Sequence, residues 1–173
     1  MSKRPVHSKQ FWKQRLEAAG VHSPSRYRAV YDCSPDLWVR IQAAHQAILE
    51  QYVREFTSIL DVGCGWGRLL GMMPPNWKGY YAGVDLSPDF VALARREHPG
   101  REFYCSPVEA FVTPRRFGLA VLVSVRGMIL REQGEVQWNS MRDNLSTMAE
   151  RALYLEYDPQ DPGSLELLRT SPA

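Results

Sequence analysis

The chain has little of what a metal centre or a disulfide-stabilised fold requires. It has three cysteines, at positions 33, 64 and 105, and they form no C-x-x-C pair. Its four histidines, at positions 7, 22, 45 and 98, are dispersed along the sequence. Such spacing matches neither a zinc cluster nor a disulfide framework, so we expect no bound metal. Free thiols of this kind are typical of a reducing compartment, which predicts a cytoplasmic location.

Long apolar runs and a strong net charge are also missing. No run approaches the roughly 20 apolar residues that a membrane span needs, so no membrane association is expected. The basic segment 1–15 lacks the apolar core of a signal peptide. With 21 basic and 19 acidic residues, the net charge of +2 gives no global field that would favour nucleic acid. The basic segment is then either a solvated amphipathic helix or an arm that contacts phosphates.

The residues that are present fit a single α/β domain. At 173 residues and 45% hydrophobic composition, the chain is long enough for one good core. Helical periodicity and capping residues predict helices before Gly20, after Ser34, from Arg68 to the break at Pro74, from the Ser87 cap to about His98 and over 138–148. We divide the domain into a helical lid at 1–55, a βα core at 56–158 and a tail at 159–173. The predicted strands lie at 58–62, 80–85, 102–105, 119–125 and 152–157.

The most informative segment is the turn after the first predicted strand. Residues 59–67 read I-L-D-V-G-C-G-W-G, an apolar strand followed by three glycines at alternate positions. Glycine tolerates positive φ and lets the backbone approach a ligand closely, so backbone N–H groups can face that ligand. The spacing is not the G-x-G-x-x-G of pyrophosphate binders, and no Lys-Ser/Thr pair comes after it. A nucleoside triphosphate is therefore not expected.

A carboxylate lies at the distance along the chain that a ribose site requires. The predicted strand 80–85 ends in Asp85, 18 residues after Gly67. In doubly wound sheets, an acid at the end of the second strand accepts hydrogen bonds from ribose hydroxyls.

Together, L-D-V-G-C-G-W-G and the strand ending G-V-D-L-S resemble the class I S-adenosylmethionine-dependent methyltransferases, over about positions 58–157. The resemblance implies a Rossmann-like open parallel sheet of strand order 3-2-1-4-5, with helices on both faces. It implies that Asp61 holds the methionine amino end and that Asp85 binds the ribose hydroxyls. Ser106 would meet the adenine amino group. The remaining residues expected to bind the cofactor are Gly63, Cys64, Gly65, Gly67, Leu86 and Ser124.

The segment after the fourth predicted strand constrains the acceptor. Residues 124–128 read S-V-R-G-M, without the N-P-P-Y or D-P-P-Y of amino-methylating DNA enzymes. We therefore expect methyl transfer from S-adenosylmethionine to an oxygen or nitrogen of a small molecule. Two alternatives stand. One is a nucleic-acid or protein acceptor recruited by the basic N-terminal helix, and the other is a non-catalytic S-adenosylmethionine-binding module.

Methyl transfer needs alignment more than covalent help, so catalytic candidates are side chains placed to face the acceptor. For His45, on the apolar stripe of its helix, the alternatives are a general base and a packing residue. Arg126 is either a substrate clamp or part of an internal salt bridge. Tyr31 either contacts the acceptor or docks a helix. Further candidates with similar alternatives are Tyr27, Trp38 and Glu156.

The C-terminal region departs from the resemblance. Only 16 residues come after Tyr157, too few for the strand hairpin that usually completes the sheet. Segment 164–169 is expected to form one short helix or an edge strand. An unprotected sheet edge invites association, so we expect a homodimer in preference to a monomer with its tail folded back.

Overall fold

The computed structural model describes residues 8–155 and 168–169, and its centre is one six-stranded sheet of order β3-β2-β1-β4-β5-β6. The first five strands are parallel and have the predicted order. The strands are β1 (Ser58–Val62), β2 (Tyr80–Asp85), β3 (Glu102–Cys105), β4 (Phe117–Val123), β5 (Ala149–Leu155) and β6 (Leu168–Arg169). The predicted bounds of the first three are confirmed.

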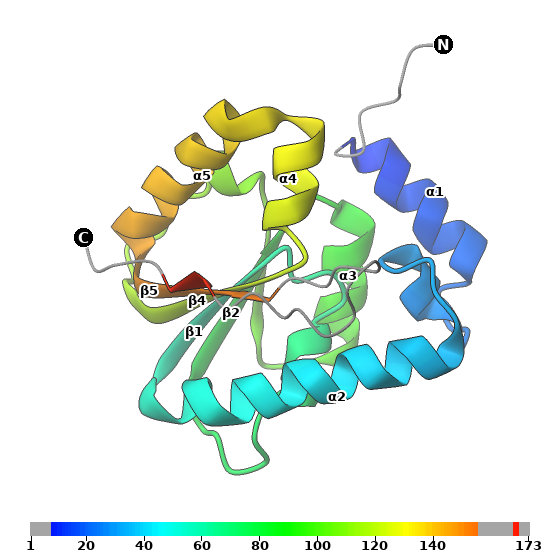
Figure 1. Cartoon of the computed structure of the whole chain (residues 1–173), viewed down its shortest axis with the longest axis horizontal. Coiled ribbons are helices and arrows are strands. Elements are labelled where there is room, and N and C mark those ends of the chain that lie inside the picture. The colour runs from blue at the N-terminus through cyan, green and yellow to red at the C-terminus, as the bar shows by residue number, and fades with distance from the viewer. Residues whose placement is uncertain (1–7, 156–167, 170–173) are drawn as a thin grey trace.

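Helices cover both faces of this sheet, as Figure 1 shows. On one face α2 (Pro35–Tyr52) and α3 (Pro88–Glu97) pack on the side chains of one pleat. On the other, α4 (Arg126–Glu132) and α5 (Gly134–Met148) pack on the opposite pleat. The central strands β1 and β4 are therefore buried on both sides, which explains their nearly continuous apolar sequences.

Serine caps set where three helices begin. The hydroxyls of Ser8, Ser34 and Ser87 each accept a hydrogen bond from the backbone N–H three residues later. They precede α1 (Lys9–Ala19), α2 and α3. Gly20, at φ 79°, ends α1. These local signals confirm the predicted helices before Gly20 and after Ser34.

The structure corrects the sequence prediction around β4. This strand begins at Phe117 and ends at Val123, whereas we expected 119–125. Ser124 leaves the strand with φ 59°, and the chain turns directly into α4, which was not predicted. The helix expected after Gly67 is the short 3₁₀ segment η3 (Arg68–Met72).

The N-terminal helices pack beside α3. Between α1 and α2 lies a 3₁₀ turn, η1 (Arg26–Ala29), and its neighbour Arg15 donates to the Ala29 and Arg28 carbonyls at 2.6 and 2.8 Å. Arg26 donates to both carboxylate oxygens of Glu97, at 2.5 and 3.0 Å. Arg15 therefore fixes α1 to the η1 turn, and Arg26 fixes that turn to α3. Of the two, Arg15 belongs to the basic segment 1–15, and its contacts support a structural role for that residue.

Part of the β5 edge is paired within the chain. β6 runs antiparallel to β5, with Arg169 opposite Leu153 and Leu168 opposite Tyr154. This agrees with the edge-strand alternative at Leu168 and Arg169, while 164–167 lie outside the described residues. Glu156 and the predicted end of β5 at 156–157 lie outside the described residues. The homodimer stays a prediction.

Candidate active site

A cavity of about 360 Å³ opens at the carboxyl ends of the parallel strands. That volume lies in the usual range for small-molecule sites. Turns after β1, β2, β3 and β4 form one wall, while α1, the segment after η1 and the α4–α5 pair form the other. Of the predicted site residues, those in the lining are Tyr31, Gly63, Cys64, Gly65, Asp85, Leu86, Ser106 and Ser124.

The backbone donors of the glycine turn are already used by the protein. The N–H groups of Gly63 and Cys64 both donate to the Val84 carbonyl, at 2.8 and 3.1 Å. The Gly65 N–H donates to Asp85 Oδ2 at 2.8 Å. The N–H groups of these three residues therefore have partners within the protein, and the expectation that they face a ligand is wrong for Gly63, Cys64 and Gly65. The turn contributes shape and close approach, in keeping with its lack of a phosphate-binding motif.

Each glycine of the turn has positive φ, but at only one of them does the missing side chain leave room for a ligand. A Cβ on Gly63 would lie 2.6 Å from Val125 Cγ2, and one on Gly67 would lie 2.6 Å from His98 Cδ2. Gly67 therefore packs toward α3 and does not line the cavity. Gly65, at φ 53°, is buried, yet a Cβ there would meet nothing within 4 Å. Because Gly65 lines the cavity, that Cβ would occupy cavity space.

Asp85 is held in one orientation at the end of β2. Its Oδ2 accepts from Gly65 N and its Oδ1 from Ser87 N, both at 2.8 Å. Each carboxylate oxygen keeps a further acceptor position, so the group can still receive two hydroxyl donors. Burial raises the pKa of Asp85, and the two backbone N–H donors oppose that rise. The residues present therefore fit a ribose.

The cavity continues past Asp85 along the turn after β3. Ser106 N donates to the Asp85 carbonyl at 3.0 Å, and Ser106 Oγ donates to the Pro107 carbonyl at 2.9 Å. Because the Ser106 proton is donated to Pro107, the hydroxyl oxygen is left as an acceptor, which suits the amino group of a base. With Leu86 and Val108 in the same wall, this end fits a flat base.

Asp61 does not reach the cavity. It is 3% exposed, and Oδ2 accepts from the Tyr81 hydroxyl at 2.6 Å. Burial raises the pKa of Asp61 to about 7, although Tyr81 and Arg68 oppose the shift. The direct contact with a methionine amino group that the resemblance implies finds no support in this position.

Two of the catalytic candidates also lie outside the lining. His45 is fully buried in α2, and neither ring nitrogen has a hydrogen-bond partner among the described residues. Burial, with Arg68 nearby, lowers the pKa of His45 to about 3, so the ring is neutral. Arg126 begins α4 with its guanidinium 5.8 Å from the Trp138 ring centroid. Both positions favour packing roles.

Tyr31 and Ser124 meet inside the cavity. Their hydroxyls share a hydrogen bond across 93 residues of sequence, joining the segment after η1 to the end of β4. The positive φ of Ser124 is a strained conformation for a non-glycine residue, and such strain concentrates at functional sites. Tyr27 and Trp38 stack on each other at 5.0 Å outside the lining, which supports a docking role for that pair.

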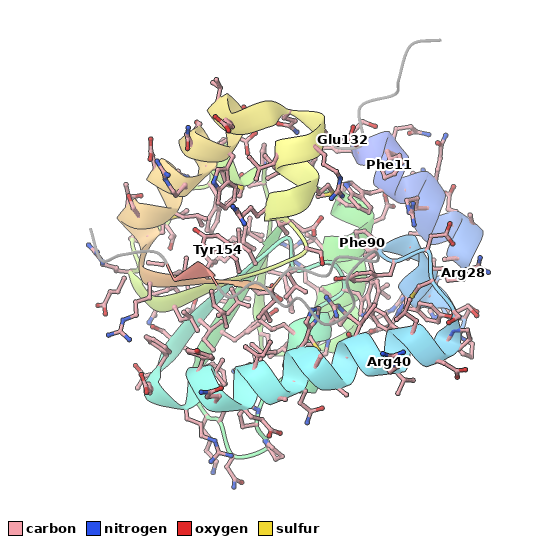
Figure 2. The ribbon with its side chains drawn as sticks, in the orientation of Figure 1. Phe11, Arg28, Arg40, Phe90, Glu132 and Tyr154 are labelled. Carbon is pink, nitrogen blue, oxygen red and sulfur yellow. The ribbon has the colours of Figure 1, made fainter. Side chains whose placement is uncertain are left out.

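Sequence reasoning missed several lining residues. Arg68 comes directly after the glycine turn, which was the available signal, but we had assigned that segment only to a helix start. Phe90 of α3 lies beside the N-terminal helices in Figure 2 and contacts Trp12 and Trp66. The lining from α4, α5 and the residue between them was not predicted, although Met141 lies in the helix expected over 138–148; it comprises Met128, Ile129, Gln133, Gln137 and Met141.

Membrane-spanning helices and metal-binding clusters are both absent from the described ranges. No helix there is long and apolar enough to cross a membrane. Likewise, the described histidines, cysteines and acids form no group of three placed to hold a metal ion.

Comparison with known proteins extends this picture. Residues 59–145 match the family described as "Methyltransferase domain". Over 71 residues the chain is 32% identical to dTDP-3-amino-3,6-dideoxy-alpha-D-glucopyranose N,N-dimethyltransferase of Streptomyces fradiae, covering 41% of this chain and 28% of that enzyme.

Solved structures share the fold. The N-methyltransferase NodS from Bradyrhizobium japonicum, in complex with S-adenosylhomocysteine, has a TM-score of 0.60 at 18% identity over 83% of this chain and 71% of that one. The amino pentose methyltransferase CalS10 from Micromonospora echinaspora, bound to S-adenosylmethionine, has a TM-score of 0.56 at 19% identity, covering 71% of this chain and 52% of that one. The chain thus spans about half the length of CalS10.

Proposed function

This chain belongs to the methyltransferase domain family, and from that we propose that it transfers a methyl group from S-adenosylmethionine to a nitrogen or oxygen of a small molecule. The observation that carries the proposal is the pairing of Gly65 with Asp85. A carboxylate anchored by two backbone N–H groups faces the cavity, next to a glycine whose missing side chain leaves room for a ligand. That arrangement suits a nucleoside with free ribose hydroxyls.

The bound donor supplies a methyl group already activated by a sulfonium, so the chain has to bind, orient and exclude water. Asp85 would receive the ribose hydroxyls, while Leu86 and Ser106 would face the base. The acceptor would approach over the end of β4, beside Tyr31 and Ser124, whose hydroxyls already hold each other. The N-terminal helices cover this end and would keep water out.

Within that proposal, an amine nitrogen is the favoured acceptor. The carboxylates in the described lining, Asp85 and Glu109, belong to the β2 and β3 side, and no described lining residue is a histidine. A hydroxyl acceptor would lack a base beside Tyr31 and Ser124, whereas a neutral amine brings its own lone pair. The Streptomyces fradiae relative, by its name, methylates the amine of a nucleotide-linked amino sugar.

The test combines binding with turnover. Calorimetry should show that the purified chain binds S-adenosylhomocysteine, and labelled S-adenosylmethionine should transfer its methyl group to an amino sugar or another small amine. Binding without transfer to any acceptor class would favour the non-catalytic module. Transfer to RNA or protein, with the steep salt dependence of phosphate contacts in the RNA case, would favour a macromolecular acceptor.

A further inference from the structure

The cavity extends past the proposed donor site, toward the end of β4. The residues assigned to the base, the ribose and the glycine turn come after β3, β2 and β1. On the far side of β1, the chain leaves β4 at Ser124 and enters α4 at Arg126. The hydrogen bond between the Tyr31 and Ser124 hydroxyls brings the segment after η1 to the same place. We call this part of the cavity the acceptor end; its described lining is Val30, Tyr31, Ser124, Val125, Met128 and Ile129.

Positive charge is scarce around this cavity. Among the described lining residues the only cation is Arg68, which comes directly after the glycine turn and is bonded to α2. Asp85 and Glu109 bring two carboxylates to the same lining, whereas Arg126 lies outside it. Proteins hold a diphosphate with Arg or Lys side chains or with unpaired backbone N–H groups at a turn. The described residues of the acceptor end include no cation, so a nucleotide-linked acceptor would find no counter-charge among them.

Met128 is the apolar side chain of α4 that the protein core does not use. Its neighbours Ile129 and Leu130 pack in the apolar cluster on that face of the sheet, as does Val125. Met128 belongs to no apolar cluster of the described residues, although it is half-buried and lines the cavity. An unbranched thioether can adapt its shape to the ligand that it contacts. Met128 is therefore placed to contact the acceptor.

We propose that the acceptor is an amine on an uncharged, apolar carbon skeleton, and that Met128 contacts this skeleton beside the donor. This inference rests on the proposed function, because it requires methyl transfer to a small amine in this cavity. Val30 and Ile129 would cover the skeleton together with Met128. The amine nitrogen would lie next to the hydroxyls of Tyr31 and Ser124.

The transfer needs no further reactant. The lone pair of the neutral amine forms the new N–C bond, while the S–C bond of the donor breaks and its electron pair stays on sulfur. The products are a methylated ammonium and the thioether S-adenosylhomocysteine, and the ammonium then releases a proton to water. The chain contributes an apolar surface that orients the amine and excludes water.

The first test compares three amines as acceptors of labelled methyl groups. Cyclohexylamine and glucosamine share a six-membered ring and a primary amine, but only glucosamine has hydroxyls, and a dTDP-linked amino sugar adds a diphosphate. Counted on the unprotonated amine, kcat/KM should be about 10- to 100-fold higher for cyclohexylamine than for glucosamine, because its apolar surface leaves water. The dTDP-linked sugar should have the lowest value. Any other order, equal values included, would overturn the apolar acceptor.

The second test is calorimetry on the chain saturated with S-adenosylhomocysteine. Met128→Ala should weaken cyclohexylamine binding about 3- to 30-fold and leave S-adenosylhomocysteine affinity unchanged. Met128→Leu keeps most of the apolar volume and should recover most of the loss. Met73→Ala is the matched control, because Met73 is also a half-buried methionine, but it packs on an apolar cluster outside the lining. Unchanged cyclohexylamine affinity in Met128→Ala, or an equal loss in Met73→Ala, would remove Met128 from the acceptor site.

If Met128→Ala does not fold, Met128→Gln replaces it, since glutamine keeps the length of the side chain and makes its end polar. The same loss of cyclohexylamine affinity is expected, and an unchanged affinity would contradict the role of Met128. Failure of the proposed function looks different from failure of this inference. Transfer that prefers glucosamine or the dTDP-linked sugar would overturn only the apolar acceptor. Transfer to no small amine and no small alcohol would overturn the proposed function, and this inference with it.

Discussion

The two walls of the cavity are built in different ways. On the donor side, Asp85 bonds Ser87, two residues away, and Gly65, 20 residues away, so neighbouring turns fix the geometry. The opposite wall joins distant parts of the chain: Tyr31 meets Ser124 across 93 residues, and the layer behind it is held where Arg26 meets Glu97 across 71, both outside the lining. The first wall depends on the turns of the sheet, whereas the part of the second wall that α1 and the segment after η1 form exists only when the N-terminal helices are docked.

This difference separates two tasks. Backbone bonds inside one sheet give the donor wall a single arrangement, which suits a ligand that is the same in every reaction cycle. The N-terminal helices dock on the outside of the sheet, through the small apolar cluster around Leu16 and Phe90 and a few polar contacts. Such peripheral elements open at a lower free energy than a buried sheet does. We therefore expect substitutions in the donor wall to act on donor affinity, and those in the opposite wall to act on stability and on the acceptor.

The largest effect we expect lies beneath the donor wall, at Asp61. Its pKa in the folded protein is raised to about 7 from 3.8, so ionisation is harder in the folded state than in the unfolded one. Its contribution to stability is therefore complete below about pH 4, falls as pH rises from about 4 to 7, and is flat above that. The total loss is on the order of 4 kcal/mol.

Asp61→Asn tests this, because its amide oxygen can still accept from Tyr81 and it does not ionise. Urea unfolding at pH 4.5, 6 and 8 should show the variant gaining stability relative to wild type as pH rises. A stability difference that stays constant across these pH values would show that Asp61 is not perturbed by its burial.

Asp85→Ala should produce the next largest effect, on donor binding. The variant loses an acceptor for two ribose hydroxyls, which we expect to weaken S-adenosylhomocysteine binding by about 2–4 kcal/mol. Calorimetry measures the loss, with circular dichroism to show that the variant is folded. Asp89→Ala is the matched control, since it removes a nearby aspartate, in the first turn of α3, that lies outside the lining and should leave affinity unchanged. Unchanged affinity in Asp85→Ala would remove the ribose assignment.

Gly65→Val tests the space that the missing side chain leaves. We expect it to weaken S-adenosylhomocysteine binding by about 1–3 kcal/mol, the usual range for overpacking. Gly100→Val is the control: Gly100 also has positive φ, at 84°, and its added Cβ would also meet nothing within 4 Å, but it lies outside the cavity. Both variants should lose stability from backbone strain. Only Gly65→Val should lose affinity, and equal affinities would make the turn purely structural.

The contrast between contacts of neighbouring turns and contacts of distant segments also explains how much of the fold was predictable. The bounds of β1, β2 and β3 and the capped starts of α2 and α3 depend on short-range patterns: apolar runs, Ser-Pro caps and Gly or Pro breaks. Asp85 was predicted to face a ligand because both its spacing and its strand end are local features. For these elements the sequence pattern and the final packing require the same residues.

The rest depended on contacts that no local pattern reveals. The end of β4 was misplaced because Ser124 turns away from the strand, where its N–H bonds the Leu155 carbonyl at 2.7 Å. Helix α4 begins without a side-chain hydrogen bond at its N-terminus, so no capping residue in the sequence predicts where it starts. The position of Arg68 depends on Gln42 and Trp38, which only the docked α2 brings near. The interpretation of His45 required knowing that it is buried away from the cavity.

Tyr31→Phe tests the wall opposite the donor side, and we expect a smaller effect than for Gly65→Val. Removing the hydroxyl breaks the bond to Ser124 and should lower the free energy of unfolding by about 0.5–1.5 kcal/mol. We expect the KM for the acceptor to rise while S-adenosylhomocysteine affinity stays the same. Tyr27→Phe serves as the control, because Tyr27 is buried in the same N-terminal layer but outside the lining. If the affinity for S-adenosylhomocysteine fell and the KM for the acceptor stayed unchanged, Tyr31 would belong to the donor wall.

The smallest effect we predict concerns the strain at Ser124, where the two walls meet. Alanine and glycine both remove its hydroxyl, so both variants lose the bond to Tyr31, and they differ only in how they tolerate φ 59°. A left-handed conformation costs a non-glycine residue about 1–2 kcal/mol, part of which the greater freedom of glycine in the unfolded chain cancels. Ser124→Gly should therefore be more stable than Ser124→Ala by about 0.5–1 kcal/mol in urea unfolding. The opposite order would mean that the chain leaves β4 without the left-handed turn, and that Ser124 does not hold the second wall through a strained backbone.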